Sequence, residues 1–392
     1  MKKLLVFALV LSMGLTLTAC GEDESPASAS EESKGAVTVS EVTVDDVISS
    51  AGEDTSIDLS EIVEPEPEVI PEGCYRSELT NEWISEDLMN QRPIAVMVDN
   101  ETKAYPHIGL NQADVVYELM NSTANGRITR LMCLVKDWKN IEQFGSVRST
   151  RPTNVMLAAE WNAILVHDGG PYYINQYIAE DWSNNLSGGF ARYTNGKNWE
   201  YTEYVTSESY YNAEQDKTYA GLVSRIASAG YTEEYNSYYE GAHLEFSDSV
   251  VDFSSRADAM KVSEIDLPYP HNNSKLIYNE ETQTYDYYCY GDAHVDPLDD
   301  NNVLSFKNLI IYSVGYSVYD EHGYLIYNCI GAGTDGWYVT NGYAIPIHWA
   351  KPSENTQTIY YDLTMGGKIQ LNTGKTYITL CPDDVWSDVV FK

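Results

Sequence analysis

The feature that most restricts this chain is a break in composition at Cys74. Residues 21–72 contain sixteen Asp or Glu, a single lysine and no aromatic side chain. Such a segment cannot bury enough apolar surface to offset the entropy lost when it becomes ordered. We therefore expect residues 20–80 to be an extended, self-repelling tether, with an acidic interaction tail as the alternative. The chain beyond the tether is long enough for two domains with hydrophobic cores.

Residues 1–19 have the layout of a signal peptide, with two lysines, a short apolar run and small residues before the cut. The apolar run is shorter than the about 20 residues that span a bilayer. The sequence LTAC at 17–20 resembles the lipobox of bacterial lipoproteins. This resemblance implies cleavage after Ala19 and a lipid on Cys20, which would anchor the chain on the outer face of the bacterial cytoplasmic membrane. The alternative is an ordinary secretory signal with an accidental cysteine.

Charge and cysteine spacing exclude several classes of protein. The formal net charge is −35, and nucleic-acid binding needs clustered Lys and Arg, so we expect no nucleic-acid partner. No CxxC pair, Walker loop, GxSxG or HExxH occurs, so the sequence predicts no metal site and no cofactor. An extracellular location permits a disulfide, but the spacing does not select a pairing. The cysteines in question are Cys74, Cys133, Cys289, Cys329 and Cys381.

The expected fold class is α+β, with an N-terminal mixed α/β domain at 81–240. Apolar strand-like runs alternate there with helix-like stretches. Pro152 suits the first turn of one helix, and Ser149 or Thr150 would be its N-cap. The expected strands are 92–98, 114–119, 127–135 and 162–166; the expected helices are 152–161, 173–181 and 215–229; and 183–209 is expected to be mostly polar loop.

A C-terminal antiparallel β domain, barrel-like or sandwich-like, is expected at 303–392 after a connecting segment at 241–302. Short strand-like runs are separated there by turn residues, and Asn341-Gly342 is the strongest hairpin signal because both turn residues need positive φ. The expected strands are 303–314, 316–320, 324–330, 336–340, 343–349, 357–362, 368–371 and 376–381.

An arginine cluster is the best candidate site. The sequence GSVRSTRP at 145–152 places Arg148, Ser149, Thr150 and Arg151 just before an expected helix, whose free N–H groups and partial positive charge favour anions. Guanidinium groups add two-pronged contacts to carboxylate or phosphate. The preceding strand would add Arg127 and Arg130 at one edge of the same anion-binding pocket. The alternative is that these arginines pair with acids such as Glu118 or Glu160.

A second candidate is the sequence HDGG at 167–170, which follows an apolar strand. His167 or Asp168 could move a proton there, and the glycines would allow a ligand close approach. A turn with a satisfied histidine is at least as good a reading. Asp99, at the end of the first strand, could orient an arginine or bind a metal.

Tyrosine is abundant, with 32 in the chain. Aromatic faces suit sugar binding, but tyrosine also fills sheets and surfaces in secreted proteins, and we take filling as the more frequent use.

Five sequence blocks resemble the YerB-like bacterial lipoproteins, a two-domain family with no settled activity. They are RPIAVMVDN (92–100), GLNQADVVYEL (109–119), GRITRLMCLV (126–135), GSVRSTRP (145–152) and AILVHDGG (163–170). The C-terminal sequence 331–382 also resembles the family, so the likeness covers nearly all of 83–382. One block departs: 190–208 reads FARYTNGKNWEYTEYVTSE where an Arg-rich stretch is usual, which puts any role of that loop in doubt.

The order of strand-borne Asp and Arg, Arg-rich turn and Gly-Gly is also similar to the LytR-CpsA-Psr envelope phosphotransferases. That likeness is short and does not establish a reaction. Two functions therefore remain. The first is a non-catalytic envelope module that binds an anionic wall component or a protein partner. The second is a phosphoryl or glycan transferase acting on a polyprenyl pyrophosphate-linked substrate, with Asp99, His167 and Asp168 as candidate catalytic residues. Whether the chain is an enzyme is left open.

Overall fold

The computed structural model describes residues 69–392, so the expected signal peptide, the lipidated Cys20 and most of the expected tether lie outside the described residues. The described part forms one compact unit. Within it, no helix has both the length and the apolar character needed to cross a membrane. Its five cysteines are all free thiols.

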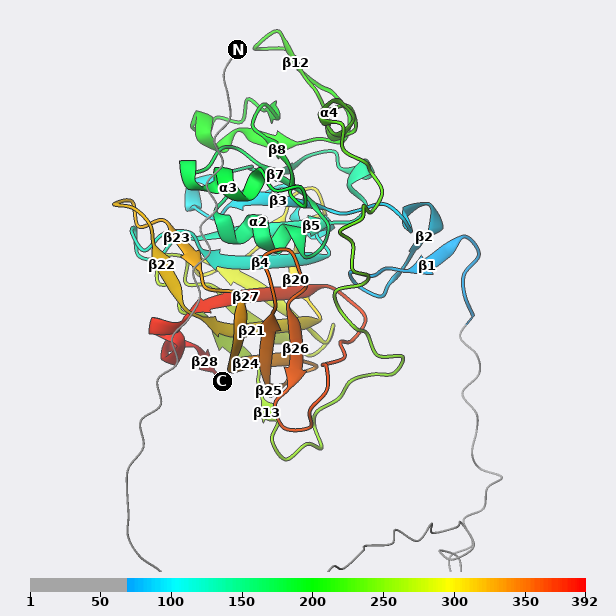
Figure 1. Cartoon of the computed structure of the whole chain (residues 1–392), viewed down its shortest axis with the longest axis vertical. Coiled ribbons are helices and arrows are strands. Elements are labelled where there is room, and N and C mark those ends of the chain that lie inside the picture. Colours follow the sequence, from blue (N-terminus) through cyan, green and yellow to red (C-terminus); the bar gives the residue numbers. More distant parts are fainter. Residues whose placement is uncertain (1–68) are drawn as a thin grey trace, which may run out of the picture. The chain divides into compact units, whose positions relative to one another are not determined.

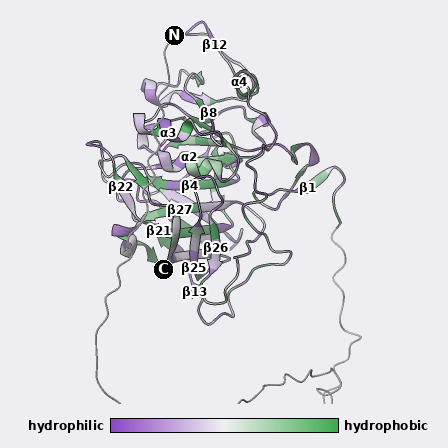
Figure 2. Cartoon of the chain, viewed as in Figure 1, coloured by the Kyte–Doolittle hydropathy of each residue, from purple (hydrophilic) through white to green (hydrophobic). Residues whose placement is uncertain are grey.

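The largest sheet has eleven strands, which come from both the N-terminal and the C-terminal halves of the described chain (Figure 1). Its order is β13 (Met260–Lys261), β25 (Tyr343–Lys351), β24 (Gly331–Thr340), β21 (Asn308–Val314), β27 (Thr376–Pro382), β4 (Val115–Met120), β5 (Thr129–Val135), β3 (Ile94–Asp99), β7 (Ile164–His167) and β8 (Asn184–Ser187), with β26 (Ile359–Asp362) paired to β25. Strands from the C-terminal half of the sequence therefore continue the sheet formed by strands from the N-terminal half. Much of the hydrophobic sequence lies in these strands (Figure 2).

The four strands expected in the N-terminal half are confirmed as β3, β4, β5 and β7. Every residue of β3 and β4 is buried. Burial on both faces explains the continuous apolar run of β3 before Asp99, whereas β4 buries the acid Glu118 among its apolar residues. Helix α2 (Pro152–Ala159) is also confirmed, with Pro152 in its first turn. The expected cap is wrong, because Arg151 is the N-cap residue and no side chain caps the helix.

The expected polar loop at 183–209 is wrong, because it contains β8, β9 (Ala191–Arg192), η7 (Trp199–Tyr201) and β10 (Glu203–Val205). Strand β8 is the edge strand of the sheet and reads Asn-Asn-Leu-Ser, with only Leu186 buried. An edge strand does not need an apolar sequence, so hydrophobic periodicity does not reveal it. Strands β9 and β10 form a small sheet with β6 (Phe144–Gly145).

Both remaining expected helices are shorter than predicted. The stretch at 173–181 holds one 3-10 turn, η6 (Tyr172–Ile174), and one short helix, α3 (Asn175–Ile178). The helix expected at 215–229 is confined to α4 (Leu222–Ala229), which ends at Gly230 with φ +72°. The residues before it form a hairpin of β11 (Tyr210–Asn212) and β12 (Lys217–Tyr219).

In the C-terminal half the hairpin at Asn341-Gly342 is confirmed, with φ +50° and +80° in the turn between β24 and β25. Strand β24 contains the spacing GxGxxG in GAGTDG, but no helix follows it, so it is not a nucleotide-binding loop. The expectation of a wholly antiparallel domain is wrong at β27, which runs parallel to both β21 and β4. Residues 368–371 form only isolated bridges rather than a strand.

A second, six-stranded sheet is made largely by residues expected to be a connection. Its strands are β17 (Asp292–Ala293), β16 (Thr284–Cys289), β15 (Lys275–Asn279), β14 (Glu264–Asp266) and β28 (Val390–Phe391), with β20 (Ser305–Phe306) paired to β16. Short pairs complete the structure: β1 (Cys74–Arg76) with β2 (Trp83–Ser85), β18 (Val295–Asp296) with β19 (Asn302–Val303), and β22 (Tyr316–Val318) with β23 (Leu325–Tyr327). The 3-10 turns not named above are η2 (Glu86–Leu88), η3 (Thr102–Ala104), η4 (Leu110–Gln112), η5 (Trp138–Asn140) and η8 (Asp383–Asp388).

Buried polar contacts join the early and late parts of the chain. The Glu118 carboxylate on β4 accepts hydrogen bonds from Ser274 at 2.6 Å and from Tyr377, on β27, at 2.6 Å. Glu160, after α2, forms a fully buried ion pair of 2.8 Å with Lys351 on β25. Each carboxylate is buried and accepts hydrogen bonds from its own half as well, from Thr129 to Glu118 and from Tyr117 to Glu160. The contacts from the other half therefore help to fix how the two halves pack.

Candidate functional site

A cavity of about 460 Å³ opens where three parts of the chain meet: the ends of β3 and β5, the segment before α2, and the turn between β22 and β23. It is mainly polar. Its lining consists of Asp99, Glu101, Asn121, Ser122, Ala124, Asn125, Ile128, Arg130, Arg148, Ser149, Arg151, Tyr201, Glu321, His322 and Tyr324.

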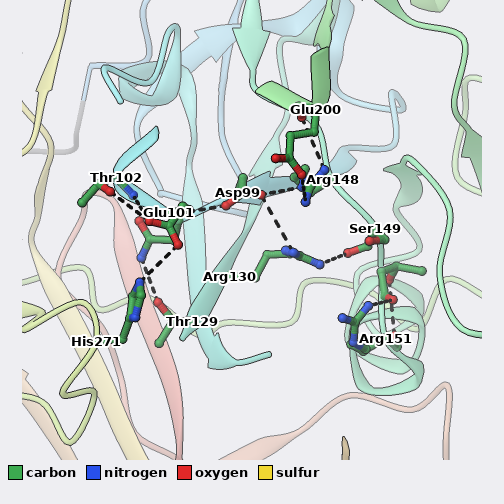
Figure 3. Close-up of polar contacts among 12 residues, drawn as sticks. Asp99, Glu101, Thr102, Thr129, Arg130, Arg148, Ser149, Arg151, Glu200 and His271 are labelled. Atoms are coloured by element: carbon green, nitrogen blue, oxygen red, sulfur yellow. Dashed lines mark hydrogen bonds and ion pairs between the residues drawn. The ribbon is translucent and has the colours of Figure 1, made fainter. Parts of the chain in front are cut away.

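Sheet register brings the first charged pair together. Strands β3 and β5 are antiparallel, and Asp99 is directly opposite Arg130, so the two side chains emerge on the same face. The segment leading to α2 then pairs with the end of β3, since the Arg148 N–H donates to the Met97 carbonyl at 2.9 Å. This contact places the Arg148 side chain beside the same carboxylate (Figure 3).

Asp99 is the shared acidic partner of two guanidinium groups. Its side chain is 4% exposed, and its Oδ2 lies 2.5 Å from Arg148 Nε and 4.0 Å from the nearest Arg130 nitrogen. Arg148 also contacts the exposed Glu200 at 3.2 Å. The Asp99 carboxylate therefore neutralises mainly the charge of Arg148. The buried charge of Arg130 is only partly neutralised.

Arg151 has no carboxylate partner among the described residues. Its guanidinium lies 3.7 Å over the ring of Tyr324 and donates to the Thr150 carbonyl at 2.8 Å. Arg130 similarly donates to the Ser149 carbonyl at 2.6 Å. The Nε–H groups of Arg130 and Arg151 are buried without a hydrogen-bond partner, which is unusual for buried donors and leaves capacity for another acceptor.

Burial is the main influence on the pKa values of these two arginines. Burial lowers the pKa of Arg130 to about 9; the charge of Asp99 raises it, while Arg151 and Arg148 lower it further. Burial also lowers the pKa of Arg151, against smaller raising effects that begin with Tyr324. An anion bound between these groups would supply the missing charge and favour their protonated forms.

Four of the six expected anion ligands line this cavity: Arg130, Arg148, Ser149 and Arg151. Arg127 does not, because it forms a two-pronged ion pair with Asp384, with contacts of 3.0 and 2.5 Å. Thr150 is fully buried, and its hydroxyl donates to the Arg151 carbonyl. Asp99, the expected residue at the end of the first strand, lies between Arg130 and Arg148.

His167 and Asp168 are not cavity residues. The imidazole of His167 is buried on β7, with Nδ1 2.8 Å from the Gly169 carbonyl oxygen and Nε2 3.3 Å from Asn185 Oδ1. Burial lowers its pKa, and both ring nitrogens face polar groups of the protein rather than the cavity. Asp168 pairs with Arg192 at 3.2 Å.

The alternative acidic partners of the arginines are also placed elsewhere. Glu160 pairs with Lys351, and Glu118 accepts hydrogen bonds from hydroxyl and amide groups, among them Thr129 at 2.7 Å. Arginine pairing with these two acids is therefore wrong. Within the described residues, no group of three or more His, Cys, Asp or Glu is arranged to hold a metal ion.

Sequence reasoning missed the wall contributed by the β22–β23 turn. Ser122 and Tyr324 form an isolated bridge, and the Thr123 N–H donates to the Gly323 carbonyl at 2.9 Å, which brings His322 and Tyr324 to the arginines. The only signal was the turn sequence Glu-His-Gly, and a turn sequence does not say what the turn packs against. Tyr201 was missed because its region was read as loop.

Comparison with known proteins agrees with this two-part construction. Residues 79–220 match the N-terminal domain of a protein family of unknown function, DUF3048, and residues 265–378 match its C-terminal domain. The chain is 24% identical over 318 residues to YerB of Bacillus subtilis (strain 168), a protein named as a lipoprotein; the alignment covers 79% of this chain and 86% of YerB.

The crystal structure of YerB from Bacillus subtilis superposes with a TM-score of 0.61 at 20% identity, covering 81% of this chain and 99% of that one. At this identity the likeness concerns the fold. The described chain is strand-rich, and its two family domains share one sheet, because β27 of the C-terminal match pairs with β4 of the N-terminal match. This chain belongs to the YerB-like, DUF3048 family of two-domain proteins of unknown function.

Proposed function

We propose that this chain is a membrane-anchored binding module of the cell envelope, and that its arginine cavity holds an anionic group of a wall component. The observation that carries the proposal is the pair of buried guanidinium groups, Arg130 and Arg151, whose Nε–H donors have no partner beside an open cavity. An unpaired buried donor is costly, so an arrangement that keeps two of them is better explained by a ligand than by stability.

The chemistry of the cavity favours phosphate over a neutral ligand. Of the three guanidinium groups, Arg148 contacts the buried Asp99 and the exposed Glu200, and Arg130 lies 4.0 Å from Asp99. Arg151 contacts no carboxylate among the described residues, although Glu101 and Glu321 also line the cavity. A phosphate group carries more than one negative charge and enough acceptor oxygens for several arginines at once. A single carboxylate on the ligand would satisfy fewer of these donors.

The family relationship supports a location at the membrane. YerB is named as a lipoprotein, and a lipid on Cys20 would hold the folded part on the outer face of the cytoplasmic membrane. A wall polymer or a lipid-linked wall precursor would then be the anionic component within reach.

Binding is preferred to phosphoryl or glycan transfer because the cavity lacks the proposed base. His167 and Asp168 lie outside its lining, and Asp99 is engaged by Arg148. A general base must reach the proton it removes.

The test is a calorimetric titration of the soluble chain from Gly21 onward with pyrophosphate. The change is Arg151→Gln or, as a more exposed second site, Arg148→Gln, each checked for folding by circular dichroism. Loss of one charge-assisted contact should weaken binding by about 10- to 100-fold. The matched control is Arg127→Gln, because Arg127 pairs with Asp384 away from the cavity. Equal affinities for all four proteins, or no binding by any of them, would reject the proposal.

A further inference from the structure

Three tyrosines beside the arginine cavity form an exposed aromatic surface that the proposed function does not use. Tyr172 is 84% exposed and Tyr319 is 50% exposed, and Tyr173 lies between them. We call Tyr172, Tyr173 and Tyr319 the tyrosine shelf. Exposure of aromatic rings to water is unfavourable, so a group of exposed rings is typical of a binding surface.

The shelf is built by two segments that are far apart in the sequence. Tyr172 and Tyr173 belong to η6, which follows the Gly-Gly turn after β7, and Tyr319 follows β22. The Tyr173 ring meets Tyr172 edge-on at 5.4 Å and Tyr319 at 5.0 Å. The Tyr173 hydroxyl also donates to Asp320 at 3.2 Å. Tyr173 therefore fixes the shelf, while Tyr172 and Tyr319 present their rings to solvent.

The shelf and the arginine cavity share one wall. Asp320, which holds Tyr173, accepts hydrogen bonds from the backbone N–H groups of His322 and Tyr324 at 3.0 and 3.1 Å. His322 and Tyr324 line the cavity, and Tyr324 lies under the guanidinium of Arg151. A ligand that enters the cavity near Arg151 therefore has the shelf at its side.

We propose that the tyrosine shelf is a carbohydrate subsite, and that the ligand of the cavity is a phosphorylated glycan. This inference rests on the proposed function. The phosphate occupies the arginine cavity, and the adjoining sugar ring lies on Tyr172 and Tyr319. The C–H face of a sugar packs on an aromatic ring, while its hydroxyl groups keep polar partners.

The surroundings favour a sugar over an apolar protein surface. Each shelf ring carries a hydroxyl group, and the hairpin beside it supplies two acids and a histidine, Asp320, Glu321 and His322. Protein-docking patches are also rich in tyrosine, but charged residues are depleted at their centre. Here the aromatic faces alternate with hydrogen-bonding groups, as a polyhydroxylated ring requires.

The experiment compares three probes on the chain from Gly21 onward: inorganic phosphate, N-acetylglucosamine 1-phosphate and N-acetylglucosamine. We expect the sugar phosphate to bind about tenfold more tightly than phosphate, because stacking adds to the charge contacts. Tyr172→Ala and Tyr319→Ala should each remove most of this gain and leave the phosphate affinity unchanged. Tyr211→Ala is the matched control, because Tyr211 is 56% exposed on β11 and its hydroxyl donates to Asp216.

The outcomes separate this inference from the proposed function. Equal affinity for phosphate and sugar phosphate, or a gain that survives both shelf substitutions, overturns the carbohydrate subsite and leaves the anion site standing. Absence of binding by both charged probes overturns both. Light scattering adds one further outcome: dimerisation that Tyr172→Ala abolishes would make the shelf an interface between copies and overturn the subsite.

Discussion

Asp99→Asn is the substitution that most directly separates a ligand site from a self-compensated ion cluster. The carboxylate lies 4.0 Å from Arg130 and 2.5 Å from Arg148, so it competes with any anion for the same guanidinium groups. Asparagine keeps the shape and the oxygen that accepts the Glu101 N–H at 2.8 Å. Only the negative charge is removed.

The size of the effect follows from Coulomb's law. An anion held on the far side of Arg130 would be roughly 8 Å from Asp99, where two unit charges repel by about 2 kcal/mol at an effective dielectric constant of 20. Loss of that repulsion corresponds to about a 30-fold gain in affinity. Asp99→Asn should therefore bind pyrophosphate more tightly than the unchanged chain. It should also unfold more easily, by about 1–3 kcal/mol, because the arginines lose their buried partner.

The assay is calorimetry at two salt concentrations, with stability followed by urea unfolding. The matched control is Glu200→Gln, which removes the exposed acid on Arg148 and should change affinity by less than about threefold, because water and salt screen that pair. Weaker or unchanged anion binding by Asp99→Asn would refute the reasoning, since it would mean that the carboxylate does not compete with a ligand.

Two further predictions concern stability. Lys351→Met leaves the fully buried Glu160 carboxylate without its cation and should lower the free energy of unfolding by about 3–5 kcal/mol. Adding Glu160→Gln should recover part of this lost stability. A loss below about 1 kcal/mol would show that the ion pair does not hold α2 to β25. Burial lowers the pKa of His294 to about 4, and its Nε2 lies 2.8 Å from Nδ1 of the buried His107, whose pKa is also lowered by burial. The unfolded state then binds more protons, so the stability from these histidines should be fully present above about pH 6.5 and fall as pH drops toward 4. His294 alone should account for about 3 kcal/mol of that loss, and His107 should add to it. A melting temperature that is flat over this range would contradict the prediction, and His294→Asn should reduce the slope.

The sequence was most informative where burial is two-sided or a turn needs positive φ. Strand β3 is buried on both faces, so its apolar run at 94–98 is a clear strand signal, and the Asn341-Gly342 turn has few alternatives. Strand β8 lacks both signals because it is polar and lies at the edge. The parallel placement of β27 beside β4 depends on contacts between residues about 260 apart in the chain, which local patterns do not contain.

The candidate site shows the same division. The local sequence placed Arg148, Ser149 and Arg151 together because they are neighbours, and the β3–β5 register added Arg130. The sequence also suggested Arg127 as a ligand. Arg127 lies three residues before Arg130, but it has φ +61° in the turn ahead of β5. That turn directs its guanidinium to Asp384 instead. Strand register, not proximity in sequence, decides which arginines share the cavity.

The start of helix α2 was expected to supply the positive charge of the anion site, and the structure does not show this. The N-cap residue, Arg151, makes no capping contact, and its side chain lies on Tyr324 of the β22–β23 turn. The cavity therefore owes its positive charge to guanidinium groups rather than to the helix terminus. Its walls come from both family domains, since Arg130 and Arg148 belong to one and His322 and Tyr324 to the other. A ligand that contacts both walls is bound only when the two domains are packed together, so its binding free energy adds to the stability of their packing.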